Sequence, residues 1–202
     1  MRNKVLLGIF VALLVSSMLV QTPQAVLTEP DDVSFLILLG YAFGWSYFEF
    51  LEIVEGWGCD VTVTGNTSHL QSCLNREDRS IEADILISDI EREDLSQYDV
   101  LFVPSGGQWH DLIATESALN LIKMAYEEGL VVAGLCIGVT PVAASNITEG
   151  KMVTGHNFCY PYVSASGGTL FPFMRVVSDG RLITGDNGDG PVSYTHLRAH
   201  ET

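Results

Sequence analysis

A cysteine between two glycines, in Gly134-Leu135-Cys136-Ile137-Gly138, is the feature that most constrains how this chain folds. An apolar run at residues 130–133 leads into it, and Thr140-Pro141 follows it. This order predicts a buried strand that turns sharply into a helix, with Cys136 at the apex. Such a turn strains the backbone of its apical residue and needs nearly side-chain-free residues two positions before and after. The pattern is typical of a nucleophile elbow, and a buried structural cysteine in a tight turn is the alternative interpretation.

The helix predicted to begin near Thr140 bears on the chemistry of Cys136. Pro141 suits the first turn of a helix, where a missing N–H costs nothing. The partial positive charge at the start of that helix stabilises a nearby thiolate. We therefore predict that Cys136 is an ionisable nucleophile.

Length and charge limit the classes of protein to which the chain can belong. A chain of 202 residues with 47% hydrophobic residues is long enough for one globular domain with a sizeable core. Its 10 Lys and Arg residues stand against 25 Asp and Glu residues, so the formal net charge is −15. Nucleic acid is excluded as a partner, because phosphate neutralisation needs clustered basic residues. The acidity indicates high solubility and does not bear on the fold.

Residues 1–25 are predicted to be a targeting segment. Arg2 and Lys4 precede an uncharged stretch at residues 5–20, and small and polar residues follow as far as Ala25. The apolar run is shorter than the ~20 residues of a typical spanning helix, which favours a signal peptide and an exported, extracellular or periplasmic, protein. An uncleaved N-terminal anchor is the alternative, because Pro23 makes a poor cleavage site; residues 5–20 would then tether the protein to a membrane.

Four cysteines are too few for a disulfide-dense framework in a domain of this size. Cys59 and Cys73 flank one predicted strand and its following loop, so they are candidates for a disulfide. Cys136 lies in the elbow, and Cys159 lies in an aromatic loop. The sequence has no C-x-x-C spacing, which argues against a structural zinc site. We expect no metal and no other cofactor.

Apolar runs and amphipathic segments alternate along the chain after residue 33. Between Ser46 and Gly56, apolar side chains recur at helical spacing and glutamates lie between them, which predicts an amphipathic helix. The run at 34–39 has the pattern of a central parallel strand covered on both faces. Alternation of this kind predicts an open α/β sheet with helices on both faces. The predicted strands are 34–39, 59–64, 98–104, 130–133 and 151–154, with a shorter exposed strand at 81–90 and a hairpin at 174–183; the predicted helices are 46–55 and 117–128, and 158–168 is predicted to be a loop.

Three chemically distinctive segments each follow a predicted parallel strand. They are Gly40, Ser105-Gly106-Gly107 and Cys136. The carboxyl ends of parallel strands share one edge of a sheet, and ligands of open α/β sheets bind outside that edge. We therefore predict that these segments lie together on one rim.

The last ten residues, 193–202, lack the apolar periodicity of a closing helix. We interpret them as a non-native tail that replaces natural sequence, which would leave one face of the sheet partly bare. His196 and His200 lie four residues apart, but no third ligand is near, so we assign no metal site to them.

Several of these blocks, in their order along residues 33–192, resemble the DJ-1/PfpI family of the class I glutamine amidotransferase-like superfamily. The resemblance implies a flavodoxin-like three-layer sandwich with a mostly parallel sheet and a cysteine nucleophile elbow. It also implies a homo-oligomer, with Cys136 as the nucleophile or as a redox-sensitive thiol. The blocks are 98–107, the helix from Ser117, 134–138, 150–156 and 179–185.

The same resemblance implies the groups that support the thiol. The backbone N–H groups of Gly107 and Ile137 would form an oxyanion hole, because a Gly-Gly loop lets the main chain approach closely. His156 lies near the position that supplies a histidine in other members. His110, beside the Gly-Gly loop, is the reserve base.

Two departures from the family pattern affect the site. Protease-like members have a histidine directly after the cysteine, and this chain has Ile137, which cannot accept a proton. The family's acidic residue near the thiol aligns with Ser46; Glu49, one helical turn later, is the candidate substitute.

Two classes of function follow from these residues. The first is a cysteine-nucleophile enzyme that attacks a carbonyl, either as a peptidase or amidase or in glyoxalase or deglycase chemistry on small aldehydes. Its substrate would be a small carbonyl compound or a peptide. The second is a non-enzymatic redox sensor, chaperone or binding module whose thiol only oxidises. An α/β-hydrolase would need an acid and a histidine on further strands, and a glutamine amidotransferase would need a downstream His-x-Glu pair that the sequence lacks.

Overall fold

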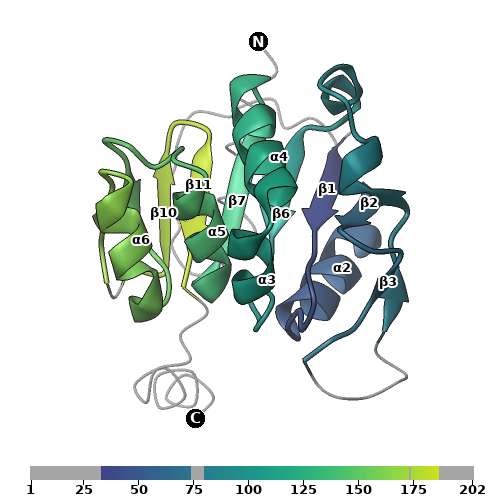
Figure 1. Cartoon of the computed structure of the whole chain (residues 1–202), viewed down its shortest axis with the longest axis horizontal. Helices are drawn as coiled ribbons and strands as arrows, with labels where there is room; N and C mark the ends of the chain where they lie inside the picture. The colour runs from purple at the N-terminus through teal and green to yellow at the C-terminus, as the bar shows by residue number, and fades with distance from the viewer. Residues whose placement is uncertain (1–32, 74–79, 173, 187–202) are drawn as a thin grey trace.

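A seven-stranded sheet forms the centre of the protein (Figure 1), seen in a computed structural model that describes residues 33–73, 80–172 and 174–186. The strand order is β10-β11-β7-β6-β1-β2-β5. Every neighbouring pair is parallel except β10 and β11, which form an antiparallel hairpin. The strands are β1 (Ser34–Leu38), β2 (Asp60–Gly65), β5 (Ile85–Leu86), β6 (Val100–Val103), β7 (Val131–Leu135), β10 (Val176–Asp179) and β11 (Leu182–Gly185).

Helices pack on both faces of this sheet and make the predicted three-layer flavodoxin-like sandwich. Helix α2 (Ser46–Gly56) contributes Tyr47 and Val54 to the core on one face. The other core contains residues of four helices. These are α3 (Trp109–Ala114), α4 (Glu116–Glu127), α5 (Val139–Ala144) and α6 (Tyr160–Ala165).

The alternation of side chains along β1 shows why the sheet is covered twice. Leu36 and Leu38 pack with the four-helix face, whereas Phe35 and Ile37 pack with α2. All four are at most 1% exposed. Burial of side chains of this size stabilises the fold by about 1.5–3 kcal/mol each before entropy is counted. The apolar run therefore forms a central strand, as predicted.

Short elements connect the main layers. A two-residue antiparallel pair, β3 (His69–Leu70) and β4 (Ile81–Glu82), lies between β2 and β5 in the chain. A two-residue parallel pair, β8 (Met152–Val153) and β9 (Thr169–Leu170), brackets α6. The 3-10 turns are η3 (Ile87–Asp89), η4 (Glu93–Gln97), η5 (Cys136–Gly138) and η6 (Asn157–Cys159).

Two local predictions are wrong. The strand predicted at 81–90 is divided into β4, β5 and η3, because Asp84 exchanges hydrogen bonds with the backbone of Val63 through both its own N–H and its carboxylate. The loop predicted at 158–168 contains η6 and α6 instead. Pro161 lies in the first turn of α6, where proline is tolerated. Val163 is the fully buried residue of this helix. Helix α3 was not predicted.

The disulfide considered between Cys59 and Cys73 is not formed. Cys59 is buried and Cys73 is exposed, and no disulfide occurs in the described part of the chain. The predicted targeting segment 1–25 and the tail 193–202, with His196 and His200, lie outside the described residues. Within the described ranges, no helix is long and apolar enough to cross a bilayer.

Candidate active site

The backbone of Cys136 has the strained conformation that the sequence pattern predicts. Cys136 follows β7 directly and begins η5, after which α5 starts at Val139. Its φ angle is +54°, in the left-handed region. This region costs a residue with a Cβ atom about 1–2 kcal/mol. Such strain persists only where neighbouring structure imposes it, and it is concentrated at functional sites.

The two glycines of the elbow allow this close packing in different ways. A Cβ atom on Gly138 would lie 2.5 Å from the carbonyl oxygen of Pro104 and 2.6 Å from that of Val103. Both are backbone atoms at the end of β6, so they have little freedom to move. A Cβ atom on Gly134 would lie 3.2 Å from the Val142 side chain, a softer contact. The elbow is thus pressed directly against the strand that leads into the Gly-Gly loop.

The carbonyl group of Cys136 is held by the segment that follows β8. It accepts a hydrogen bond from the His156 N–H at 3.3 Å and one from the Cys159 thiol at 3.4 Å. A Cβ atom on Gly155 would lie 2.9 Å from the same oxygen. We call residues 155–159 the carbonyl clamp. Its contacts with the carbonyl oxygen hold the backbone of Cys136 in place.

Cys159 is a buried thiol that the sequence placed in a loop of unassigned role. Its side chain is fully buried and accepts a hydrogen bond from the Thr140 hydroxyl at 3.3 Å. Burial raises the pKa of Cys159 to about 11, and the charge of a Cys136 thiolate contributes in the same direction. Cys159 is therefore a neutral hydrogen-bond donor to the elbow at physiological pH, and it competes poorly with Cys136 as a nucleophile.

The Gly-Gly loop is held in place by the loop after β1. Gly106 has a φ angle of +139°, and a Cβ atom there would lie 2.2 Å from the Gly44 nitrogen. The Ser105 N–H donates to the Ser46 hydroxyl at 2.9 Å. Gly106 also pairs with Phe43 as an isolated antiparallel bridge, and the Gly44 N–H donates to the Ser105 carbonyl at 2.9 Å.

Gln108 ties the same loop to the end of β1, and the sequence analysis did not identify it. Its side-chain oxygen accepts from the Gly40 N–H at 2.8 Å, and its amide nitrogen donates to the Pro104 carbonyl at 2.7 Å. Gln108 is fully buried. The oxygen and the nitrogen of its side-chain amide therefore both have partners, and together they connect the ends of β1 and β6. The sequence signal that could have indicated this role is the position of the glutamine directly after the Gly106-Gly107 pair.

The two predicted bases are placed differently. His156 is half-buried, and its backbone contacts the elbow. Its Nδ1 accepts from the Phe158 N–H at 3.2 Å, so a neutral ring carries its proton on Nε2. His110 is exposed at the start of α3, where its ring lies 3.5 Å from that of Trp109.

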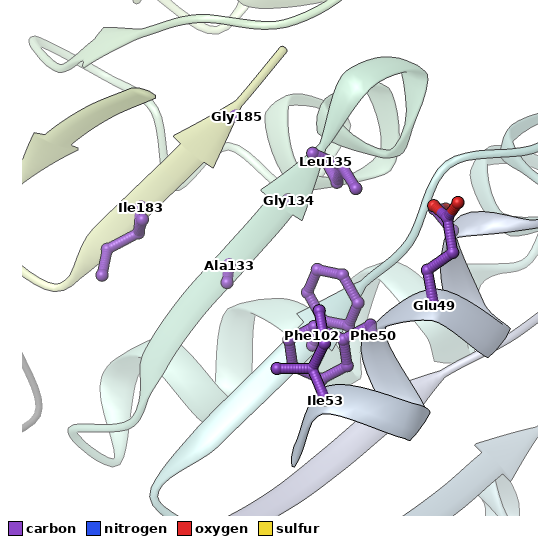
Figure 2. A pocket seen from close by; sticks show the side chains of 10 residues that line it. Glu49, Phe50, Ile53, Phe102, Ala133, Gly134, Leu135, Ile183 and Gly185 are labelled. Carbon is purple, nitrogen blue, oxygen red and sulfur yellow. The ribbon is translucent and has the colours of Figure 1, made fainter. Parts of the chain in front are cut away.

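The position that is acidic in the family, Ser46 in this chain, provides no carboxylate. Ser46 is 8% exposed, and its hydroxyl is the acceptor for Ser105. Glu49 is exposed on α2 and lies beside a cavity of about 160 Å³, shown in Figure 2, at the same end as Leu135. The remaining lining is mainly apolar and comes from α2, β6, β7 and β11: Phe50, Ile53, Phe102, Ala133 and Ile183, with Gly134 and Gly185.

This cavity lies on the α2 face of the sheet and stops one residue short of Cys136. Cys136 itself is only 4% exposed and does not line the cavity. The predicted rim is assembled, because the Gln108 side chain joins Gly40 to Pro104 and Gly138 of the elbow packs against the Pro104 carbonyl. Within the described ranges, no group of three or more His, Cys, Asp or Glu side chains is arranged to hold a metal ion.

Comparison with known proteins identifies the family to which this chain belongs. The model of the DJ-1/PfpI family matches residues 33–196. Protein DJ-1 homolog D of Arabidopsis thaliana is 32% identical over 93 residues, which are 45% of this chain and 24% of that protein. Isonitrile hydratase of Pseudomonas putida is 28% identical over 109 residues, which are 54% of this chain and 47% of that protein. The chain thus spans less than half the length of each of these relatives.

A solved structure shows the same architecture. The crystal structure of a ThiJ/PfpI domain protein from Brachyspira murdochii has a TM-score of 0.66 and 22% sequence identity. The alignment covers 77% of this chain and 87% of that chain. At this level of identity the likeness supports the fold, and the chemistry has to be argued from the residues present.

Proposed function

Because the chain belongs to the DJ-1/PfpI family, we propose that it is an exported cysteine-nucleophile enzyme that acts on small dicarbonyl compounds. The observation that carries this proposal is the φ angle of +54° at Cys136. Gly138 packing and the carbonyl clamp both impose that strained conformation. A cysteine with only a structural role does not require a backbone held in this way.

The first step would be addition of the Cys136 thiolate to the aldehyde carbon of a dicarbonyl. A sulfur–carbon bond forms, and the electron pair of the C=O π bond moves to oxygen. The resulting hemithioacetal oxyanion would accept hydrogen bonds from the N–H groups of Gly107 and Ile137. This role is supported by the position of Gly107 in the loop after β6, because Gly138 of the elbow packs against the end of that strand.

The second step would move a proton. A base removes the hydrogen from the former aldehyde carbon, and protonation of the neighbouring carbon gives the thioester of a 2-hydroxy acid. Water then hydrolyses the thioester and restores the thiol, so the net reaction adds one water to the dicarbonyl and needs no oxidant or reductant. His156 is the favoured base because its backbone contacts the elbow, and His110 is the reserve.

The burial of Cys136 favours small substrates over peptides. With Cys136 only 4% exposed, a polypeptide carbonyl with substituents on both sides would have to displace the surrounding loops. A terminal aldehyde carries a hydrogen on one side and needs far less room. Peptidase or amidase activity is for this reason the less favoured reaction.

A redox sensor is the second candidate function. It is favoured by Ile137, which offers no base directly beside the thiol, and by the exposed position of Glu49. In that case Cys136 would be oxidised by a peroxide to a sulfenic acid, with release of water, and no turnover of carbonyl compounds would occur. A homo-oligomer stays a prediction for both functions.

The two functions are separated by assaying methylglyoxal consumption and 2-hydroxy acid formation with the wild type and Cys136→Ser. Cys159→Ser is the matched control, because it removes the neighbouring buried thiol. The enzyme proposal expects turnover that is lost in Cys136→Ser and retained in Cys159→Ser. The pH dependence of Cys136 alkylation should also give a thiol pKa below the ordinary value near 8.5. An ordinary thiol pKa together with no Cys136-dependent turnover would leave only the redox role.

A further inference from the structure

Two triplets in the chain have the acceptor pattern for N-linked glycans. They are Asn66-Thr67-Ser68 and Asn146-Ile147-Thr148. In an exported protein, Asn-x-Ser/Thr is an acceptor where the asparagine lies on a surface turn. Such triplets also arise by chance, so the surroundings of each asparagine have to decide between them.

Asn146 stands in a turn directly after α5 with its side chain in solvent. The residue is exposed and has a φ angle of +64°. Its N–H donates to the Ala143 carbonyl at 3.0 Å, which fixes the backbone of the turn. Its side chain has no polar partner among the described residues. A bulky group on Asn146 Nδ2 would therefore displace no recorded interaction.

The other two residues of this triplet are packed inward and hold the turn in place. Ile147 is 7% exposed and Thr148 is fully buried. The Thr148 hydroxyl is hydrogen-bonded to the hydroxyl of Ser166 at the end of α6. The asparagine thus projects from a fixed base, and the folded protein keeps the modified atom away from its core.

Asn66 has the opposite environment. Asn66 is half-buried, and its Nδ2 donates to the hydroxyl of Thr115 at 2.9 Å. Thr115 is the residue that joins α3 to α4. A sugar on that nitrogen would have to fit beside Thr115, whose hydroxyl also donates to the Asp111 carbonyl. The fold therefore disfavours a glycan at Asn66.

The position of Asn146 also leaves the candidate active site clear. Cys136 precedes α5 and Asn146 follows it, and the six-residue helix spans about 9 Å between them. A glycan at Asn146 would be attached at the opposite end of this helix from the elbow.

We propose that Asn146 is an N-glycosylation site of the exported protein. The proposal rests on the export proposed above. In the transfer, Asn146 Nδ2 forms a bond to the anomeric carbon of an oligosaccharide carried on a lipid pyrophosphate. The lipid pyrophosphate leaves with the bonding electron pair, and the amide gives up one proton.

The test is translation of the full chain in the presence of endoplasmic reticulum microsomes, followed by protease protection and digestion with peptide N-glycosidase. We expect a protected product whose electrophoretic mobility shift is removed by the glycosidase. Asn146→Gln should lose the shift completely. Asn66→Gln should keep it, and so should Thr148→Ser, which retains the hydroxyl of the acceptor triplet.

The outcomes separate the glycan from the export step. A protected chain without a glycan, or a folded product with its glycan on Asn66, would overturn the assignment of Asn146. An unprotected chain would overturn export through the native leader. The same chain placed behind a proven signal peptide then decides on Asn146, because a protected, unmodified product there also refutes the site.

Discussion

Replacement of Gly138 by alanine tests whether the elbow depends on direct backbone contact with β6. The backbone at Gly138 has φ −62° and ψ −14°, a conformation that alanine adopts without strain. The added methyl group would nevertheless lie 2.5 and 2.6 Å from two carbonyl oxygens of the β6 end, about 1 Å inside ordinary contact. Overpacking of this kind costs about 1–3 kcal/mol. The loss of glycine flexibility returns about 0.5–1 kcal/mol, so we expect a net destabilisation of about 1 kcal/mol.

Gly56→Ala is the matched control for this substitution. Gly56 ends α2, and a Cβ atom there would meet nothing within 4 Å. The control therefore isolates the flexibility contribution, and its free energy of unfolding should rise by up to about 1 kcal/mol. Both variants are measured by urea denaturation, with the unfolding slope checked against the wild type.

The difference in the free energy of unfolding between the two variants tests whether Gly138 packs against the β6 carbonyls. We expect Gly138→Ala to unfold at a lower urea concentration than the wild type and Gly56→Ala at an equal or higher one. If Gly138→Ala matched Gly56→Ala in stability, the elbow would not be pressed against the β6 carbonyls and the reasoning about the site would fail.

Two further predictions concern buried groups beside the elbow. The raised pKa of Cys159, about 11, means that the folded protein binds this proton more tightly than the unfolded chain, so stability is complete below about pH 9 and falls by roughly 2–3 kcal/mol as pH rises towards 11. Urea denaturation at pH 8 and pH 10.5 measures this loss, and a Cys159→Ala protein that loses as much as the wild type would disprove it. Gln108→Leu should destabilise the fold by about 1–3 kcal/mol for each of the two backbone groups it leaves unpaired, at Gly40 and Pro104. Unchanged stability in Gln108→Leu would show that water or a shifted loop satisfies both groups.

The features that were predicted from sequence are those with a local cause. The turn at Cys136 joins a strand and a helix that adjoin it in the chain, and a Cβ atom on Gly134 would meet Val139 and Val142, which follow within eight residues. The central strands follow from continuous apolar runs that only a doubly covered sheet can bury. The order of these elements was enough to predict the sandwich.

The features that were missed depend on contacts between distant parts of the chain. Helix α6 has no apolar stripe to announce it, and its one fully buried residue, Val163, packs against a core that the rest of the chain supplies. Gln108 bonds to Gly40 across 68 residues, and Cys159 reaches the Cys136 carbonyl across 23. No local pattern encodes such pairings, so the supports of the thiol became visible only in the folded structure.

The carbonyl clamp has a consequence for the order in which the protein acquires its reactivity during folding. The bonds that impose the left-handed angle on Cys136 join it to residues that leave the ribosome about twenty positions later, and the neighbouring Ser105–Ser46 bond closes a loop of 59 residues. A nascent or partly unfolded chain lacks these bonds, so its thiol relaxes to an unstrained geometry. The sulfur thus gains its special environment only when the last tertiary contacts form, and a collapsed intermediate carries it as an ordinary cysteine.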